Sequence, residues 1–199
     1  MTSTIPRASR QARRRILDAA LDSFAERGYE ATTIDDIRTA SGASIGTIYH
    51  HFKSKQGIAA ALFLEGLGSY QEGVIAVYAA NADAEAGVRA VVRHYLAWAA
   101  ANPRLARFLL TTRQPEVRAE TDAQLQALNA RFYGATEDWW RRQTEAGVVR
   151  ALPREIVTTV VVGPAEAFMR RWLAGRTATS LEDATRALED AAWRAVRAP

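Results

Sequence analysis

The stretch TTIDDIRTASGASIGTIYHHF, residues 32–52, decides the fold of the N-terminal part of this chain. Thr33, followed by Asp36 three residues later, forms a capping box, which predicts that a helix starts directly after Thr33. Gly42 is expected to end that helix, because glycine adopts the left-handed conformation at low cost. Ser44 is then placed to cap a second short helix. Two short helices joined by a three-residue turn predict a helix-turn-helix.

The same stretch also matches the G-x-S-x-G pattern of a serine hydrolase, at residues 42–46. A nucleophile elbow needs a strand before its serine, whereas a capped helix is expected before Ser44. His50 and His51 follow too closely to act on that serine, and neighbouring helix residues point about 100° apart, which disfavours a shared metal ion. A serine hydrolase using Ser44 is therefore a remote alternative, and we interpret Ser44 as a helix cap.

The composition restricts the class of protein. The chain has 199 residues, of which 48% are hydrophobic, with 6 prolines and 12 glycines, and this favours a helical protein with a core. It has no cysteine, which excludes disulfides, thiolate nucleophiles and thiolate metal sites. No run approaches the roughly 18 to 20 apolar residues that span a bilayer, and the N-terminus lacks an apolar signal core. We expect a cytoplasmic protein with no membrane segment, metal or cofactor.

Apolar residues recur with helical spacing along the chain, and no segment alternates as a strand would. Proline and glycine interrupt this pattern at intervals. The predicted helices cover residues 10–27, 34–41, 45–51, 55–80, 84–101, 103–112, 116–146, 153–174 and 180–197. The sequence thus predicts an all-α fold of about nine helices, with a small N-terminal unit at residues 1–52 and a larger helical body at residues 53–199.

A longer stretch around the helix-turn-helix, RRRILDAALDSFAERGYEATTIDDIRTASGASIGTIYHHFKSKQGI from Arg13 to Ile58, resembles the N-terminal domain of TetR-type transcriptional regulators. Its most specific residues are Phe24, Gly28-Tyr29, Thr32-Thr33-Ile34, Ile37, Ala40-Ser41-Gly42, Gly46, Tyr49, Phe52 and Lys55. The resemblance implies an N-terminal DNA-binding domain and a C-terminal effector-binding and dimerisation domain. It further implies a homodimer that represses transcription from a palindromic operator in double-stranded DNA and is released by a small molecule.

The resemblance places candidate DNA contacts on the second short helix and at nearby helix starts. Thr47 could meet a thymine methyl group or a phosphate, while Tyr49 and His50 could donate to phosphate oxygens. Lys55 opens the fourth helix, where its charge and the helix N-terminus both favour a phosphate. The predicted DNA-binding residues on and around this helix are Thr33, through its backbone N–H, Ser44, Ile45, Gly46, Thr47, Tyr49, His50 and Lys55.

An arginine cluster precedes the first apolar stripe, and no acidic residue lies within it. Such a cluster indicates an anionic partner or a solvated tail. In the context of the resemblance, Arg10, Arg13 and Arg14 are candidates for an arm that enters the minor groove, where arginine is attracted to narrow A·T tracts.

The helical body is expected to hold the effector pocket, lined mainly by apolar side chains. The candidate pocket residues are nine aromatic ones: Phe63, Tyr70, Tyr95, Trp98, Phe108, Phe132, Tyr133, Trp139 and Phe168. No charge-rich set of residues marks the interior, so we expect a hydrophobic or aromatic ligand. The sequence does not choose among drugs, lipids and metabolites.

The resemblance places the dimer interface on the last two helices. The candidate interface residues are Val157, Val160, Val161, Pro164, Phe168, Leu188, Ala192 and Trp193, and the alternative is that this face packs within one protomer. Pro164 should kink the helix that contains it.

Two other functions use the same DNA-binding residues, namely a transcriptional activator and a DNA-binding protein without ligand control.

Overall fold

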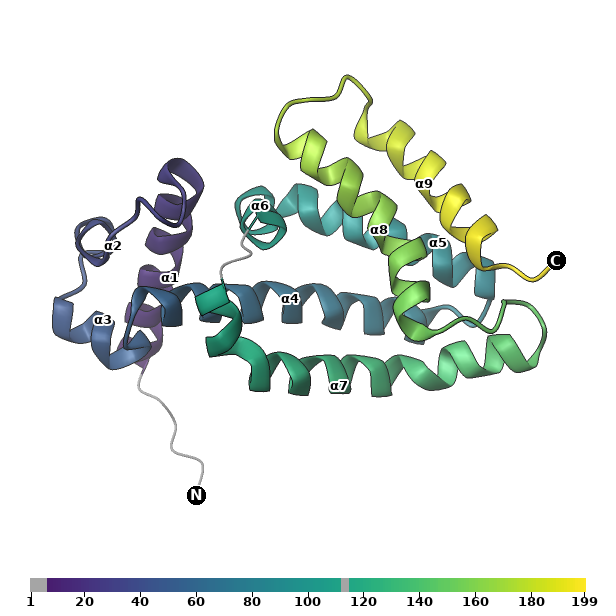
Figure 1. Ribbon diagram of the computed structural model, residues 1–199, viewed down its shortest axis with the longest axis horizontal. Helices are drawn as coiled ribbons and strands as arrows, with labels where there is room; N and C mark the ends of the chain where they lie inside the picture. Colours follow the sequence, from purple (N-terminus) through teal and green to yellow (C-terminus); the bar gives the residue numbers. More distant parts are fainter. Residues whose placement is uncertain (1–6, 112–114) are drawn as a thin grey trace. The chain divides into compact units, whose positions relative to one another are not determined.

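A computed structural model describes residues 7–111 and 115–199, and its elements are helices (Figure 1). In chain order they are α1 (Arg7–Arg27), α2 (Ile34–Ser41), α3 (Ile45–Phe52), α4 (Lys55–Ala80), α5 (Ala84–Ala101), α6 (Pro103–Thr111), α7 (Pro115–Glu145), α8 (Arg154–Leu173) and α9 (Leu181–Val196). Within the described ranges the only β pairing is an isolated antiparallel bridge between Val149 and Arg197. The predicted all-α fold of about nine helices is therefore confirmed.

The turn chemistry of the opening stretch is confirmed at each cap. The Thr33 hydroxyl accepts a hydrogen bond from the Asp36 backbone N–H at 3.1 Å, and the Asp36 carboxylate accepts one from the Thr33 N–H at 2.9 Å. Gly42 ends α2 with a left-handed φ of 66°. The Ser44 hydroxyl accepts from the Thr47 N–H at 3.1 Å and so begins α3. Local side-chain chemistry thus fixes the helix-turn-helix.

The chain divides into two compact units, and their boundary differs from the predicted one at residue 52. The first unit comprises the described residues of 1–66 and 107–125, and the second comprises 67–106 and 126–199. α4 and α7 therefore each contribute residues to both units. Ile58 of α4, for example, is fully buried and belongs to the first unit.

The core of the first unit is built by the apolar faces of α1, α2 and α3. Ile16, Ile37 and Ile48 are fully buried, one from each helix. Phe24 of α1 stacks on Phe108 of α6, with ring centroids 5.6 Å apart. Phe108 is thus a core residue of this unit, which corrects its prediction as a pocket residue.

The core of the second unit is formed where α5, α8 and α9 pack against one another (Figure 1). Val88, Val92 and Leu96 of α5 are buried there. Ion pairs fasten α9 to α5 as well, since Arg93 Nε lies 2.8 Å from a Glu189 carboxylate oxygen. The last two helices therefore use much of their apolar surface inside one protomer.

This packing corrects part of the predicted dimer interface. Ala192 and Val161 are buried within the protomer, so neither is offered to a partner, and the half-buried Val157 lines a cavity of the second unit. The remaining predicted residues are half-buried or exposed and stay a prediction: Val160, Pro164, Phe168, Leu188 and Trp193.

Candidate DNA interface and internal cavity

Helix α3 has a buried face and an exposed face, and the exposed face carries large hydrophobic side chains. Ile48 and Phe52 pack inward, whereas Ile45 is 43% exposed and Tyr49 is 48% exposed. Only four large hydrophobic side chains are exposed in the described part of the chain, so α3 carries half of them. With His50 also exposed, this face offers apolar and hydrogen-bonding groups together. An exposed helix face of this kind is suited to contact a partner.

Ser44 is confirmed as a helix cap and lacks the setting of a nucleophile. Its hydroxyl is engaged with both the backbone N–H and the hydroxyl of Thr47, at 3.1 and 2.8 Å. The element that precedes it is helix α2, whereas a nucleophile elbow requires a strand. At the start of α3, Ser44 and Gly46 are exposed and Thr47 is half-buried. They lie at the end of the helix that a helix-turn-helix directs to base edges.

The structure corrects the expectation that the Thr33 N–H serves a phosphate. That N–H donates to the Asp36 carboxylate, and the Thr33 hydroxyl contacts the same oxygen at 2.7 Å. These two hydrogen bonds hold the pKa of Asp36 below its ordinary value of 3.8, so the carboxylate is charged. A negative charge at the start of α2 disfavours a phosphate there.

Lys55 also has a different partner from the predicted phosphate. Its Nζ donates to the backbone carbonyl oxygens of Tyr29 at 2.9 Å, Glu30 at 3.2 Å and Thr32 at 2.9 Å. It also lies 4.5 Å from the centre of the Tyr29 ring. An ammonium group has three N–H donors, and three carbonyls occupy them. Lys55 therefore ties the first turn of α4 to the loop between α1 and α2.

The predicted arginine arm is part of a helix. Arg10, Arg13 and Arg14 lie in α1, whereas an arm that follows the minor groove would be extended. Arg13 pairs with Glu65 at 2.6 Å, and Arg14 pairs with Asp18 at 2.9 Å. Two of the three candidates are thus held by acidic neighbours in the first unit. The segment that precedes α1 lies outside the described residues.

The two histidines of α3 have different surroundings. His50 is exposed, while His51 is half-buried and its ring lies against those of His50 and Phe52. Burial, followed by the charges of His50 and Arg13, lowers the pKa of His51. His51 is therefore neutral over a wider range of pH, which makes His50 the better candidate for a phosphate contact.

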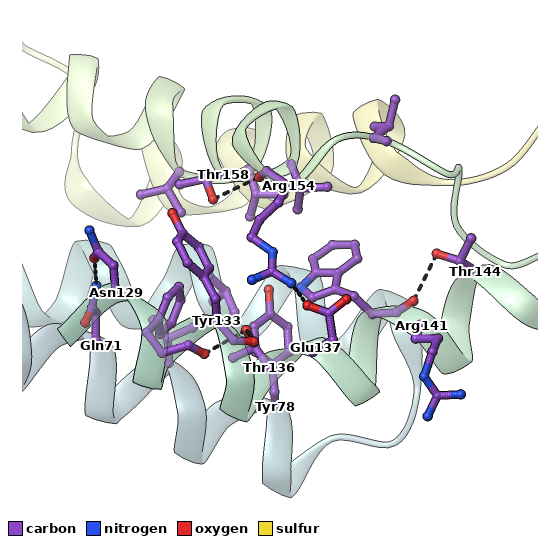
Figure 2. Close-up of a pocket in the computed structure, with 18 of the residues that line it drawn as sticks. Gln71, Tyr78, Asn129, Tyr133, Thr136, Glu137, Arg141, Thr144, Arg154 and Thr158 are labelled. Carbon is purple, nitrogen blue, oxygen red and sulfur yellow. Dashed lines mark hydrogen bonds and ion pairs between the residues drawn. The ribbon is translucent and has the colours of Figure 1, made fainter. Parts of the chain in front are cut away.

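The second unit contains a cavity of about 770 Å³ that opens to solvent at an exposed rim (Figure 2). Its walls come from α4, α5, α7 and α8 and from residues 150–152. Three of the predicted aromatic residues line it, namely Tyr70, Phe132 and Tyr133. The other predicted pocket residues do not: Phe63, Tyr95, Trp98, Phe108, Trp139 and Phe168.

The excluded aromatic residues have partners of their own. Tyr95 is buried and meets the Tyr70 ring edge-on, with centroids 5.4 Å apart. Trp139 is buried and donates its indole N–H to the Asn81 carbonyl at 2.6 Å. Its neighbour Trp140 lines the cavity instead, as does Tyr78, and neither was predicted from the sequence. The adjacent tryptophans were the available signal in the sequence. Neighbouring residues of a helix point about 100° apart, so the two side chains have different surroundings.

Charged and polar groups also line the cavity, although no charge-rich set of residues was expected in the interior. Glu166 of α8 is half-buried in its wall. Burial raises the pKa of the Glu166 carboxyl, although the charge of Arg170 opposes the shift. Gln71 of α4 is 6% exposed, and its Nε2 donates to Asn129 Oδ1 at 2.9 Å (Figure 2). Its Oε1 is buried and has no hydrogen-bond partner.

The exposed rim of the cavity carries arginines that are already engaged. Arg154 forms an ion pair with Glu137 (Figure 2), and Arg141 lies 3.2 Å from Glu145. Arg150 donates to a main-chain carbonyl of α9 at 3.1 Å. The rim therefore presents charges that are largely balanced within the protein.

Comparisons with known proteins agree with this geometry. Residues 16–62 match the family model described as bacterial regulatory proteins, tetR family. The chain is 36% identical over 147 residues to the HTH-type transcriptional repressor Rv1474c of Mycobacterium tuberculosis, which covers 69% of each chain. It is 40% identical over 84 residues to the HTH-type transcriptional repressor KstR2 of Rhodococcus jostii, but this match spans only 40% of the chain and 39% of the relative.

The fold is also found among solved structures. The transcriptional regulator FadR of Bacillus subtilis, solved in complex with stearoyl-CoA, superposes with a TM-score of 0.74 at 20% identity, over 90% of this chain and 96% of that one. This identity shows a shared fold only. None of the helices formed by the described residues combines the length and apolar character that a membrane span requires.

Proposed function

Because this chain belongs to the tetR family of bacterial regulatory proteins, we propose that it is a DNA-binding transcriptional repressor controlled by a small molecule. The observation that carries the proposal is the exposed face of α3, which is the second helix of a helix-turn-helix. Relatives named as repressors support the sign of the regulation. A protein with this task acts in the cytoplasm.

The α3 residues divide into two kinds of DNA contact. Ile45 and Thr47 are placed to read base edges, since an apolar group or a threonine methyl suits the methyl group of thymine. Tyr49 and His50 are placed to donate to phosphates, which position the helix without reading sequence. Gly46 lets the backbone approach the groove closely.

The proposal includes a homodimer, because one α3 reads too few base pairs to define an operator. Two copies would read half-sites one helical turn apart, about 34 Å, in a palindromic operator. The surface available for the dimer is the outward side of α8 and α9, with Val160, Pro164, Phe168, Leu188 and Trp193.

The cavity of the second unit supports control by a ligand. Its volume of about 770 Å³ lies within the range of small-molecule sites, roughly 300 to 1,000 Å³. A regulator of the same fold has been solved with stearoyl-CoA bound. If a ligand weakens operator binding, linkage requires the operator to weaken ligand binding by the same factor. Equal ligand affinities with and without operator would contradict this control.

Footprinting on the DNA that flanks the protein's own gene tests the DNA-binding proposal. We expect a protected palindrome that binds at least about a thousandfold more tightly than random DNA at physiological salt. Tyr49→Phe should weaken binding to all sequences, whereas Ile45→Ala should change the preferred bases. Equal affinity for every sequence tested would refute the proposal.

A further inference from the structure

One buried polar group of the cavity wall is a hydrogen-bond acceptor that lacks a donor. Gln71 is 6% exposed, and its one hydrogen bond uses Nε2, which donates to Asn129. Its Oε1 remains buried and unpaired. Leaving a buried acceptor unpaired is unfavourable, so a ligand that brings an N–H or O–H to this oxygen gains affinity.

A second acceptor lines the same cavity from α8. Glu166 is half-buried, and its charge helps to raise the pKa of both Tyr70 and Tyr95 after the larger effect of burial. The carboxylate therefore lies near the phenol groups of Tyr70, which lines the cavity, and of Tyr95, which packs against the Tyr70 ring. A negative charge among buried phenols repels a carboxylate or phosphate and attracts a cation.

The aromatic wall already carries a cation in this structure. The guanidinium of Arg154 lies 4.6 Å from the centre of the Tyr133 ring, and both residues line the cavity. Aromatic faces attract cations through their quadrupole, most strongly where water is excluded. Tyr70, Tyr78 and Trp140 add further aromatic surface to the lining.

An anionic headgroup has little to bind in this site. The arginines of the lining, as the structure describes it, are Arg141, Arg150 and Arg154, and no lysine accompanies them. Each of the three already donates to a carboxylate or a carbonyl. An anion would have to displace those partners. A cation meets Gln71 Oε1, which has no partner, and Glu166, whose charge also interacts with that of Arg170.

We propose that the cavity binds an apolar organic amine in its protonated form, with the ammonium group donating to Gln71 Oε1 and facing Glu166 while its apolar part packs on the tyrosine and tryptophan rings. This inference names the ligand class and rests on the proposed function only for the consequence that such a ligand releases DNA. The binding site itself belongs to the second unit.

Three ligands of matched shape test the inference by calorimetric titration of the purified full-length protein. They are 4-phenylbutylamine, 4-phenylbutanol and 4-phenylbutyrate, which differ in the charge at one end. We expect the amine to bind at least about tenfold more tightly than the alcohol and the carboxylate to bind most weakly. Equal affinities for amine and alcohol, tighter binding of the carboxylate, or no binding by any of the three would overturn the inference.

Two variants locate the ammonium group. Glu166→Gln and Gln71→Leu should each remove most of the preference for the amine and leave the affinity for the alcohol within about twofold. Glu155→Gln is the matched control, because it removes the same charge from an exposed position of α8 outside the cavity. An unchanged preference in both cavity variants, with thermal unfolding showing that they are folded, would refute the assignment.

Operator binding without any ligand separates this inference from the proposed function. If footprinting finds an operator but the amine is not preferred, the ligand class is wrong and the DNA-binding function stands. If the amine is preferred but no DNA sequence is, the cavity assignment stands and the regulatory function fails.

Discussion

The contacts of Lys55 lead to a prediction that distinguishes a structural tie from a phosphate contact. In Lys55→Met the ammonium group is lost while most of the side-chain volume is kept. Three backbone carbonyls, of Tyr29, Glu30 and Thr32, then lose their donor. The cation also leaves the face of the Tyr29 ring.

The expected loss of stability follows from these contacts. A hydrogen bond to a charged group contributes about 1.5 to 3 kcal/mol when buried, and a cation–π contact about 0.5 to 1 kcal/mol at exposed sites. The Lys55 side chain is half-buried, so water replaces part of each contact. We expect a net loss of about 2 to 4 kcal/mol, which for a chain of this size lowers Tm by about 4 to 16 °C.

Two measurements on the same variant decide between the two roles. Thermal unfolding should show the lower Tm. Operator binding across a salt series should show an unchanged slope of log affinity against log salt, because no phosphate contact has been removed. A phosphate contact would instead reduce the slope by about 0.9 per subunit.

Lys53→Met is the matched control for Lys55→Met. Lys53 is exposed at the end of α3, so its loss removes the same charge nearby without removing a structural tie. Its Tm should change by no more than about 2 °C. An unchanged Tm in Lys55→Met together with a reduced salt slope would refute the structural role.

The remaining predictions concern the first unit and α7. Gly57→Ala should destabilise the protein by about 2 kcal/mol or more, because a Cβ at Gly57 would lie 2.0 Å from the Phe52 carbonyl oxygen. Gly134→Ala, with open space around it, should instead stabilise α7 by up to about 1 kcal/mol. Equal Tm values for the two variants would contradict this prediction. Hydrogen bonds from Thr33 lower the pKa of Asp36 below 3.8, so its contribution is complete above that value and is lost as the pH falls below the folded-state pKa. Asp36→Asn should therefore melt below the wild type at neutral pH, and the gap should narrow in acid; a gap of the same size at both would show that Asp36 does not act through its charge.

The parts of the fold that the sequence predicted are those decided by neighbouring residues. Thr33, Gly42 and Ser44 each act within three or four positions of themselves, and their roles as caps were correct. Lys55 was misassigned because its partners are backbone carbonyls of residues 23 to 26 positions away. Every residue has a backbone carbonyl, so residue types do not show which ones a lysine contacts. The sequence shows that a lysine begins a helix but not what its ammonium group meets.

The cavity shows the same limit for packing. Trp139 and Trp140 are identical in kind and adjacent in sequence, yet one is core and the other lines the cavity. Which of the two meets empty space depends on where the helices of the second unit fail to close on one another, and periodicity does not encode that. The Gln71–Asn129 pair was likewise beyond the sequence, because it joins α4 to α7 across 58 positions.

α4 is the element on which both proposals depend. Its first turn carries Lys55, which holds the loop between α1 and α2, and its later turns carry Tyr70 and Gln71, which line the cavity. Because a helix is stiffened by its own i to i−4 hydrogen bonds, a ligand that displaces one turn of α4 tends to displace the others. We propose that a bound ligand changes the position of α3 through this helix, and that Lys55 passes the movement on to the loop between α1 and α2. Lys55→Met would then bind the ligand normally and release its operator less completely. The coupling free energy between the ligand site and the DNA site depends on the Lys55 contacts, whereas ligand binding alone does not.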